Sequence, residues 1–268
     1  MKHNFHTHTF RCLHADGEDE AYVLAALENG FSKIGFSDHT PWPYKDFVSG
    51  MRMEASELPD YVASIRALQE KYRGKIEILL GLECEYFPAY FPWLKQQIET
   101  YALDYLILGH HFSPSEISGF YNGNLRTPEQ LAYYRDDVIA GMESGLFAYL
   151  AHPDLFMNGY QEFDEHSEAV SRAVIEAAVR TNTPLEFNLL GYVRGKHNGR
   201  PGYPYPAFWK LAGEAGATAI LGIDAHRPDA YRDKALFETS EAYLRSLGLQ
   251  VTDEINSIWS DQRWKTNT

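Results

Sequence analysis

The sequence predicts a single α/β domain over residues 1–268, built as a barrel-like array of seven strand-then-helix units. Short apolar segments alternate with longer amphipathic segments along the chain, and this alternation implies parallel strands. No shift in composition marks a linker between domains. Five of the predicted strands are followed by His, Glu or Asp, from the first unit to the last. A closed barrel gathers such strand ends around one mouth, whereas an open sheet would keep its outer strands far apart.

The predicted strands are short segments bounded by turn residues. The segment 76–82 is mostly apolar, as expected of a parallel strand that is buried on both faces. Pro41 and Pro43 force a loop soon after the strand at 33–37, and a basic loop rich in Gly, Pro and Tyr is predicted at 189–206. In chain order the strands are predicted at 4–9, 33–37, 76–82, 105–109, 148–151, 184–188 and 219–223, with a shorter strand-like segment at 249–251.

The predicted helices are recognised by the residues at their ends. Acidic residues open the first helix and Gly30 closes it, while Pro59 lies in the first turn of the second. Residues 127–130 form a capping box with Pro128 at the first helical position. The tail at 260–268 is expected to be frayed. In chain order the helices are predicted at 18–29, 56–72, 90–101, 128–144, 164–181, 207–215 and 228–247.

The composition favours a cytoplasmic protein that acts on a small molecule. No apolar run approaches the roughly 20 residues that span a bilayer, the N-terminus lacks the apolar core of a signal peptide, and Cys12 and Cys84 are the only cysteines. The formal net charge of −13 disfavours nucleic-acid binding, which depends on Lys and Arg. We therefore expect a small substrate, no nucleic-acid partner and no membrane association. The sequence leaves the oligomeric state open.

A cluster of histidines at the start of the chain indicates a metal site. His6 and His8 are two residues apart on a predicted strand, so their side chains project from the same face. His14 follows after a turn-length segment. Neutral imidazole is the commonest metal ligand in proteins, and this spacing favours a metal site over isolated surface histidines. Together with the later strand ends, the candidate ligands are His6, His8, His14, His39, Glu83, His110, His152, Asp224 and His226.

The number and type of these ligands predict about three metal ions. Nine candidates exceed the four or so ligands that one tetrahedral ion takes, and shared carboxylates allow three ions to use them. Imidazole and carboxylate without thiolate favour zinc, manganese or iron. His111 is expected to project to the side opposite His110, as a core residue or as a support for a ligand. Cys84 is expected to pack in the core, on the face opposite Glu83.

Six motifs along the chain resemble those of the PHP (polymerase and histidinol phosphatase) superfamily. The resemblance extends over residues 3–230, and within the superfamily the chain is most similar to the monofunctional histidinol-phosphate phosphatases of bacterial histidine biosynthesis. In chain order the motifs are HTHTFRCLH at 6–14, GFSDHTP at 35–41, GLECEY at 81–86, LGHH at 108–111, AHPD at 151–154 and GIDAH at 222–226.

The resemblance implies a distorted seven-stranded (β/α) barrel with a trinuclear metal centre at the C-terminal ends of the strands. Carried over by position, it implies one ion held by His6, His8, Glu83 and Asp224, a second held by Glu83, His110 and His152, and a third held by His14, His39 and His226. The implied reaction is hydrolysis of L-histidinol phosphate to L-histidinol and phosphate. Another phosphoesterase of the superfamily, an amidohydrolase-type metal hydrolase and a metal-binding accessory protein are the alternatives.

Residues outside the ligand set can serve the phosphoester. Arg194, in the basic loop, is the best candidate for a bidentate phosphate clamp, whereas Arg126 is more typical of a surface arginine. Asp16 can serve either as a metal ligand or in proton transfer to the leaving group. Glu116 offers an acidic partner to a cationic substrate. The candidates for substrate binding are therefore Arg194, Arg126, Glu116 and His197, and the candidates for catalysis are Asp16 and Arg194.

Overall fold

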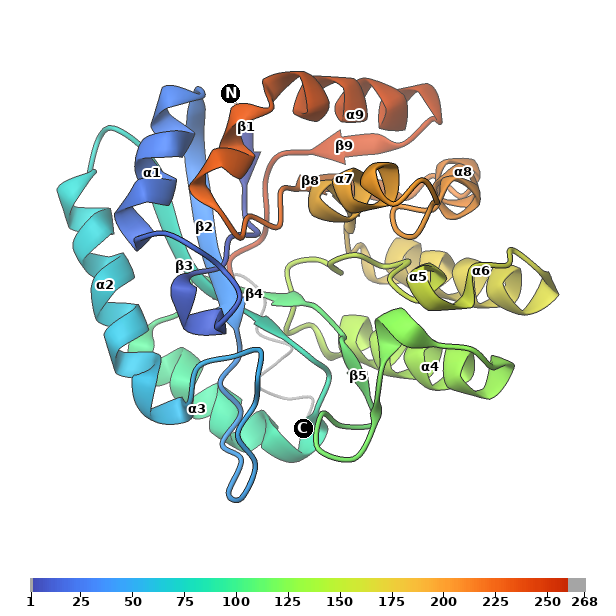
Figure 1. The fold of residues 1–268 in the computed structure, drawn as a ribbon, viewed down its shortest axis with the longest axis horizontal. Helices are drawn as coiled ribbons and strands as arrows, with labels where there is room; N and C mark the ends of the chain where they lie inside the picture. Colours follow the sequence, from blue (N-terminus) through green and yellow to red (C-terminus); the bar gives the residue numbers. More distant parts are fainter. Residues whose placement is uncertain (1, 260–268) are drawn as a thin grey trace.

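The computed structural model describes residues 2–259, so the expectation for the tail at 260–268 lies outside the described residues. Parallel strands occupy the centre and helices surround them (Figure 1). The strands are β1 (Lys2–Asn4), β2 (Phe31–His39), β3 (Glu77–Cys84), β4 (Tyr105–Leu108), β5 (Phe112–Ser113), β6 (Phe120–Tyr121), β7 (Leu185–Asn188), β8 (Thr218–Gly222) and β9 (Gln250–Thr252). The helices are α1 (Asp19–Glu28), α2 (Leu58–Lys71), α3 (Phe91–Tyr101), α4 (Pro128–Ser144), α5 (Met157–Tyr160), α6 (Glu165–Thr181), α7 (Leu189–His197), α8 (Pro206–Glu214) and α9 (Lys234–Ser246).

The sheet is parallel and curled, which confirms the predicted α/β class. Strands β1 to β4 pair in sequence order, and β7, β8 and β9 form a second parallel set. Single bridges at Leu150 link the two sets, one to Leu108 of β4 and one to Leu185 of β7. On the other side, Thr7 pairs with Ala225. The strand expected at 148–151 is thus reduced to one bridged residue, and the remaining short strands, β5 and β6, form an antiparallel pair.

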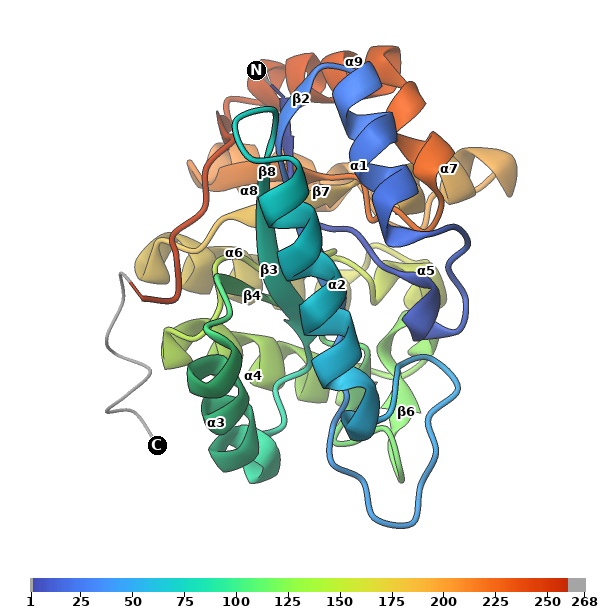
Figure 2. The ribbon, with the colours of Figure 1, turned by 90° about the vertical axis from the view of Figure 1, so that its left-hand side faces the viewer.

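One long loop stands out from this body. Residues 41–54, between β2 and α2, extend beyond the strands and helices in both ribbon views (Figures 1 and 2).

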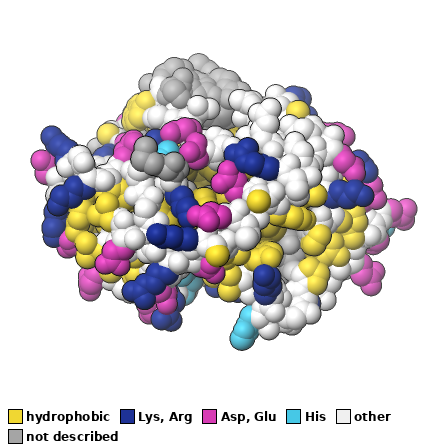
Figure 3. Space-filling model, turned by 90° about the horizontal axis from the view of Figure 1, so that it is seen from above, with side chains coloured by type: hydrophobic (Ala, Val, Ile, Leu, Met, Phe, Trp, Pro, Cys, Tyr) yellow, Lys and Arg dark blue, Asp and Glu magenta, His cyan; other side chains and the backbone are white. Residues whose placement is uncertain are grey.

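On the face of the molecule seen in Figure 3, acidic and basic side chains are interspersed and do not form separate patches. Within residues 2–259, no helix combines the length and the hydropathy that crossing a bilayer requires.

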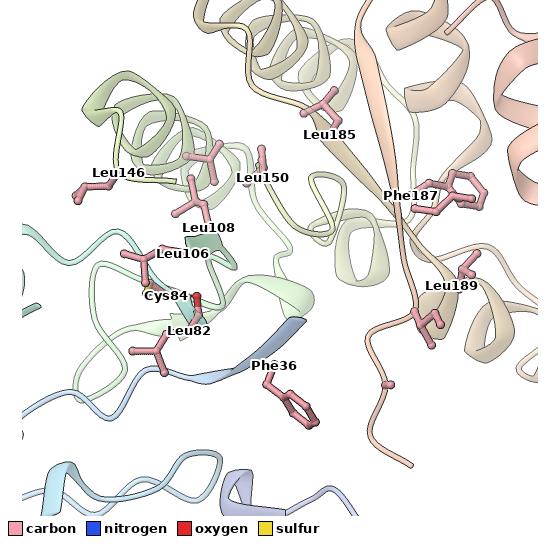
Figure 4. Packing of buried hydrophobic residues seen from close by; sticks show 14 of the residues in the cluster. Phe36, Leu82, Cys84, Leu106, Leu108, Leu146, Leu150, Leu185, Phe187 and Leu189 are labelled. Carbon is pink, nitrogen blue, oxygen red and sulfur yellow. Dashed lines mark hydrogen bonds between the residues drawn. The ribbon is translucent and has the colours of Figure 1, made fainter. Parts of the chain in front are cut away.

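Alternation along the strands divides the core into an outer and an inner part. In β4, Leu106 and Leu108 pack outward under the helices, whereas Tyr105 and Ile107 join the inner cluster with Phe5. The outer part includes the residues of Figure 4, where Cys84 lies beside leucines from β3 and β4. The expectation that Cys84 packs in the core is therefore confirmed. The inner cluster fills the space beneath the C-terminal strand ends.

Two boundaries differ from the prediction because of side-chain caps. The predicted loop at 189–206 begins with helix α7, since the Asn188 side chain accepts a hydrogen bond from the Gly191 N–H at 2.8 Å and caps the helix. The helix predicted from residue 228 instead starts as a 3₁₀ turn, Pro228–Arg232. The regular helix α9 follows only where Asp233 accepts from the Leu236 N–H.

Candidate metal centre

The predicted ligands gather at the C-terminal end of the curled sheet. His39 is the last residue of β2 and pairs in register with Glu83 of β3, so the two side chains reach the same end. Asp224 lies two residues after the end of β8, and β8 runs parallel to β7. This end also receives His6, His8, His14, His111, His152 and His226.

Glu83 is the centre of this arrangement and is almost fully buried. Its approach requires Gly109, because a Cβ at that position would lie 1.9 Å from Glu83 Oε1. Five imidazoles surround the carboxylate. Its oxygens lie 3.4 Å from His6 Nε2, 3.4 Å from His8 Nε2, 3.0 Å from His39 Nδ1, 3.5 Å from His111 Nε2 and 2.9 Å from His152 Nε2.

Asp224 supplies a second carboxylate to two of these imidazoles and to His226. Its Oδ1 lies 3.5 Å from His6 Nε2, 3.2 Å from His8 Nε2 and 3.3 Å from His226 Nδ1. Asp224 has a φ of 54° and His152 a φ of 32°, and both values lie in the left-handed region that residues other than glycine rarely adopt. Such a backbone costs about 1–3 kcal/mol and persists where the surrounding structure fixes it, often at functional sites.

A third group of ligand atoms lies next to these two carboxylates. One ring nitrogen each from His14, His39 and His226 lies within 4.8 Å of the others. His14 Nδ1 contacts the Cys12 carbonyl oxygen at 2.6 Å, so Nδ1 carries the proton and Nε2 keeps its lone pair. Burial, together with the charges of His226 and His8, lowers the pKa of His14 to about 4. His14 is therefore neutral at pH 7 and is able to bind a metal.

A further carboxylate, Glu186 of β7, supports His6 from behind. His6 Nδ1 lies 2.7 Å from Glu186 Oε1, and the other oxygen of Glu186 accepts the His152 N–H at 3.0 Å. A Cβ at Gly222 would lie 1.8 Å from Glu186, so the glycine makes room for this carboxylate. A carboxylate bonded to Nδ1 orients an imidazole and directs Nε2 at a metal. The sequence prediction missed Glu186, although an acidic residue inside an apolar strand signals it.

Several buried atoms at this centre have no hydrogen-bond partner among residues 2–259. Those that face Glu83 or Asp224 are His6 Nε2, His8 Nε2 and His39 Nδ1, together with Glu83 Oε2 and Asp224 Oδ1. A buried polar atom without a partner costs about 1–3 kcal/mol, so native proteins rarely leave one unpaired. Converging imidazole nitrogens and carboxylate oxygens are the donor set of zinc, manganese and iron sites. The residues present therefore fit divalent transition-metal ions.

In the metal-free protein, the positive charges of the histidines and the negative charges of the carboxylates balance one another. Burial disfavours the charged form of His6, but Glu186, Asp224 and Glu83 outweigh it and raise the pKa of His6 well above 6.5. Burial also opposes the charge of Glu83, yet the nearby His111, His6 and His39 hold its pKa well below the usual value. In the absence of metal, protons on the imidazoles therefore compensate the carboxylates.

Zinc uptake at pH 7 should consequently release protons. His6 and His8 have pKa values raised well above 6.5, so both are imidazolium ions at neutral pH. Each must lose one of its two ring protons before a metal can bind. The release should fall as the pH rises through these raised pKa values, and zinc affinity should fall as the pH is lowered. Calorimetric titration with zinc in buffers of different ionisation enthalpy measures the number of protons. Equal heats in all buffers at pH 7 would contradict the expectation.

The structure corrects the assignment of His110. Its Nε2 lies 2.8 Å from Ser113 Oγ and 2.9 Å from Asp137 Oδ2, and its Nδ1 accepts the Tyr86 N–H at 3.2 Å. Both nitrogens are thus engaged outside the centre, and His111 takes the place expected of His110. The reason is strand alternation, because Tyr105 and Ile107 face inward and the same parity selects residues 109 and 111.

The two catalytic candidates lie at the rim of the centre. The Asp16 N–H donates to the His226 carbonyl at 2.9 Å, which holds this exposed aspartate next to the third group of ligands. Arg194 is on α7 and interacts with the Tyr203 side chain, which also lies near Asp224. The Tyr203 ring centre is 5.9 Å from that of His152. Tyr203 was not predicted from the sequence, where it is one of 18 tyrosines without a distinguishing motif.

The other substrate-binding candidates are placed differently. Arg126 is exposed and donates to the carbonyls of Leu125 and Gly159. Glu116 is bound by Arg52 Nε at 2.8 Å, by Ser49 Oγ and by the Tyr44 hydroxyl, so both of its oxygens have protein partners. His197 is exposed at the C-terminal end of α7. The structure therefore brings only Arg194 of these four residues next to the centre.

Known proteins resemble this chain in sequence and in fold. A Deinococcus radiodurans protein named "Probable histidinol-phosphatase" is 30% identical over an alignment of 235 positions, gaps included, that covers 83% of this chain and 85% of that protein. The histidinol-phosphatase of Lactococcus lactis is 24% identical over an alignment of 278 positions, gaps included, that covers 99% of this chain. A crystal structure of the Lactococcus lactis enzyme, complexed with zinc, L-histidinol and phosphate, shares the fold with a TM-score of 0.70 at 18% identity, over 95% of this chain and 98% of that chain.

The family model described as "PHP domain" matches residues 4–188, more than half of the chain. The matched region contains His6, His8, His39, Glu83, His111 and His152, that is, most of the imidazoles and the central carboxylate of the candidate centre. On this match and on the arrangement of these side chains, the chain belongs to the PHP domain family.

Proposed function

We propose that this protein is a metal-dependent phosphatase that hydrolyses L-histidinol phosphate to L-histidinol and phosphate, a step of histidine biosynthesis. The observation that carries the proposal is the set of buried, unpaired nitrogen and oxygen atoms that converge around Glu83 and Asp224. Relatives that match most of the chain carry the name histidinol-phosphatase, which supports the choice of substrate.

The proposed cofactors are three divalent transition-metal ions, with zinc, manganese and iron as the candidates. Zinc is bound in the Lactococcus lactis structure, and three ligand groups here support the number. His6, His8, Glu83 and Asp224 would hold one ion, Glu83, His111 and His152 a second, and His14, His39 and His226 a third. Bound ions of this kind lower the pKa of water and stabilise charge on phosphoryl oxygens.

Residues of the chain would bind and orient the phosphoester. Arg194, beside the centre, would hold phosphate oxygens with its planar guanidinium. Asp16, exposed and anchored next to His226, would take a proton from bound water and pass it to the leaving alkoxide. Tyr121 lies parallel to the His111 ring with centres 6.5 Å apart, and Tyr203 faces His152. These two aromatic side chains would limit the access of water and present a flat surface to the imidazole of the substrate.

We extend the proposal to the fold and to the cellular location. The bridges at Leu150, and the bridge between Thr7 and Ala225, support closure of the sheet into one distorted seven-stranded (β/α) barrel. A cytoplasmic location is supported by Cys12 and Cys84, which are both free thiols in the buried part of the protein.

The zinc- or manganese-loaded protein should hydrolyse histidinol phosphate with the highest kcat/KM in a panel of phosphomonoesters. The panel should include nucleoside monophosphates, sugar phosphates and p-nitrophenyl phosphate, with phosphate release as the readout. We expect a margin of at least about tenfold, equivalent to roughly 1.4 kcal/mol in transition-state binding.

Other results in this assay would contradict the proposal. A nucleotide or sugar phosphate that wins by tenfold would indicate another phosphoesterase of the family. Hydrolysis of a lactone or an amide without phosphatase activity would indicate an amidohydrolase-type enzyme. Protein without added metal, treated with a chelator, serves as the control and should be inactive on all members of the panel.

A further inference from the structure

A buried carboxylate outside the ligand set, Glu85, contacts His111. Glu85 follows β3 by one residue and has no exposed surface. Its Oε1 lies 3.3 Å from His111 Nδ1 and accepts from Arg52 Nη2 at 2.7 Å. Its Oε2 accepts from Arg52 Nη1 at 3.0 Å and from Trp42 Nε1 at 2.7 Å. Each oxygen of Glu85 thus has two polar neighbours, and His111 is one of them.

The charge on Glu85 determines which partner donates. Both oxygens of Glu85 accept hydrogen bonds from the Arg52 guanidinium, which keeps its protons in proteins, so Glu85 is present as the carboxylate. An ionised carboxylate is only an acceptor, so the bond to His111 requires a proton on Nδ1. The other nitrogen, Nε2, lies 3.5 Å from Glu83 Oε1. In neutral His111 this nitrogen keeps the lone pair, and it faces the central carboxylate.

We propose that Glu85 is a positioning residue that fixes His111 in the Nδ1–H tautomer, so that its Nε2 is directed at the metal beside Glu83. The inference rests on the proposed metal centre and adds a residue that does not itself touch metal or substrate. Arg52 has the auxiliary role of holding Glu85 in place with two hydrogen bonds. Glu186 stands in the same relation to His6, which shows that the fold uses this arrangement at a second ligand.

The chain offers a matched control for this role. Glu116 is nearly as buried as Glu85 and also binds Arg52, with Arg52 Nε at 2.8 Å from its Oε2. Its remaining partners are Ser49 and Tyr44, and none of its recorded contacts within residues 2–259 is with His111. If Glu85 served only to neutralise Arg52, then Glu85→Gln and Glu116→Gln should have similar effects. If Glu85 positions His111, only Glu85→Gln should disturb the metal centre.

The geometry predicts how Glu85→Gln acts. The amide oxygen should occupy the Oε2 position, where Trp42 and Arg52 both donate. The amide NH₂ then faces His111 Nδ1 as a donor, which requires a lone pair on Nδ1 and moves the proton to Nε2. An Nε2–H imidazole cannot bind the metal beside Glu83. Zinc affinity should therefore fall by about 10- to 100-fold, the usual effect of losing such a support.

The experiment uses the zinc-loaded full-length protein labelled with ¹⁵N-histidine. Proton–nitrogen correlation spectra report the tautomer of His111, assigned by comparison with His111→Gln, and competition with a chelator gives the zinc affinity. The wild-type protein should show Nδ1–H at His111, and Glu116→Gln should match it in tautomer and within about threefold in affinity. Glu85→Asp keeps the carboxylate and should retain the Nδ1–H tautomer, which Glu85→Gln should lose along with zinc affinity.

Three results would overturn the inference. They are an Nε2–H tautomer of His111 in the wild type, unchanged zinc affinity in Glu85→Gln, and an equal loss of zinc affinity in Glu85→Gln and Glu116→Gln. The wild-type spectrum tests the predicted tautomer of His111 even if Glu85→Gln fails to fold. Failure of the proposed function is a different result, because the wild-type protein would then bind no divalent metal and release no phosphate from histidinol phosphate, and the role of Glu85 would fall with it.

Discussion

Replacing Glu83 by Gln should lower phosphatase turnover by about 10³-fold or more, which corresponds to roughly 4 kcal/mol in the activation free energy. The Glu83 carboxylate lies within 3.5 Å of nitrogens from five imidazoles, and no other carboxylate has as many histidine neighbours in the described part of the chain. An amide has the same shape, but it removes one negative charge and presents an NH₂ group to those nitrogens. The variant should therefore lose bound metal as well as activity.

Elemental analysis and turnover of histidinol phosphate, measured on the same preparation, test this expectation. Glu116→Gln is the control, because it makes the same exchange at a buried carboxylate that binds Arg52, Ser49 and Tyr44 instead of the histidine cluster. Thermal unfolding of both variants shows whether the loss is local. Glu83→Gln protein with the full metal complement and wild-type turnover would show that Glu83 does not have a central role.

The position of Glu83 could be predicted from the sequence because local rules decide it. His6 and His8 are two residues apart, so they share a face, and Glu83 lies where an apolar strand meets a loop. The end of a parallel strand is the expected place for a ligand in a barrel. The structure brings His6, His8 and Glu83 together as expected, with separations of 3.4 Å.

The structure places His111 rather than His110 at the centre, and the signal for this is the approach of Gly109 to Glu83 on the neighbouring strand. The inward parity of this strand can be set by Gly109, which must face Glu83 because no side chain fits there. Residue 111 then has the same parity and residue 110 the opposite one. The prediction took the first histidine after the end of the strand, His110, as the ligand. It did not start from the strand residues that face inward. A glycine opposite a buried acid was the signal that it lacked.

The supporting carboxylates could not be predicted because their partners are distant in sequence. Glu186 meets His6 from another strand, and Glu85 meets His111 only because β3 and β4 are neighbours. The weak pairing at Leu150 has a similar origin, since its two bridges depend on how β4 and β7 approach it. Spacing along the chain identifies a face of a strand, and the register between strands is a property of the whole fold.

Arg194→Met should reduce kcat/KM for histidinol phosphate by about 100-fold, close to the upper end of what a hydrogen bond to a charged group contributes. Arg194 interacts with Tyr203, whose ring approaches His152 and whose surroundings include Asp224. A guanidinium at this rim would meet phosphate oxygens that the metal ligands do not reach. Because the proposed metal ions and Arg194 would share the charge on these oxygens, kcat should fall as well as the affinity for substrate.

The matched control is Arg126→Met, the other arginine that the sequence suggested. Arg126 donates to the carbonyls of Leu125 and Gly159, so its loss should cost some stability and leave turnover within about threefold of the wild type. Metal content should be unchanged in both variants. The inhibition constant of inorganic phosphate distinguishes an arginine that binds phosphate from one with a structural role. Only the loss of a phosphate-binding arginine should raise this constant. If Arg194→Met leaves phosphate inhibition unchanged, or loses metal together with activity, Arg194 does not bind the phosphoryl group and acts on the centre by another route.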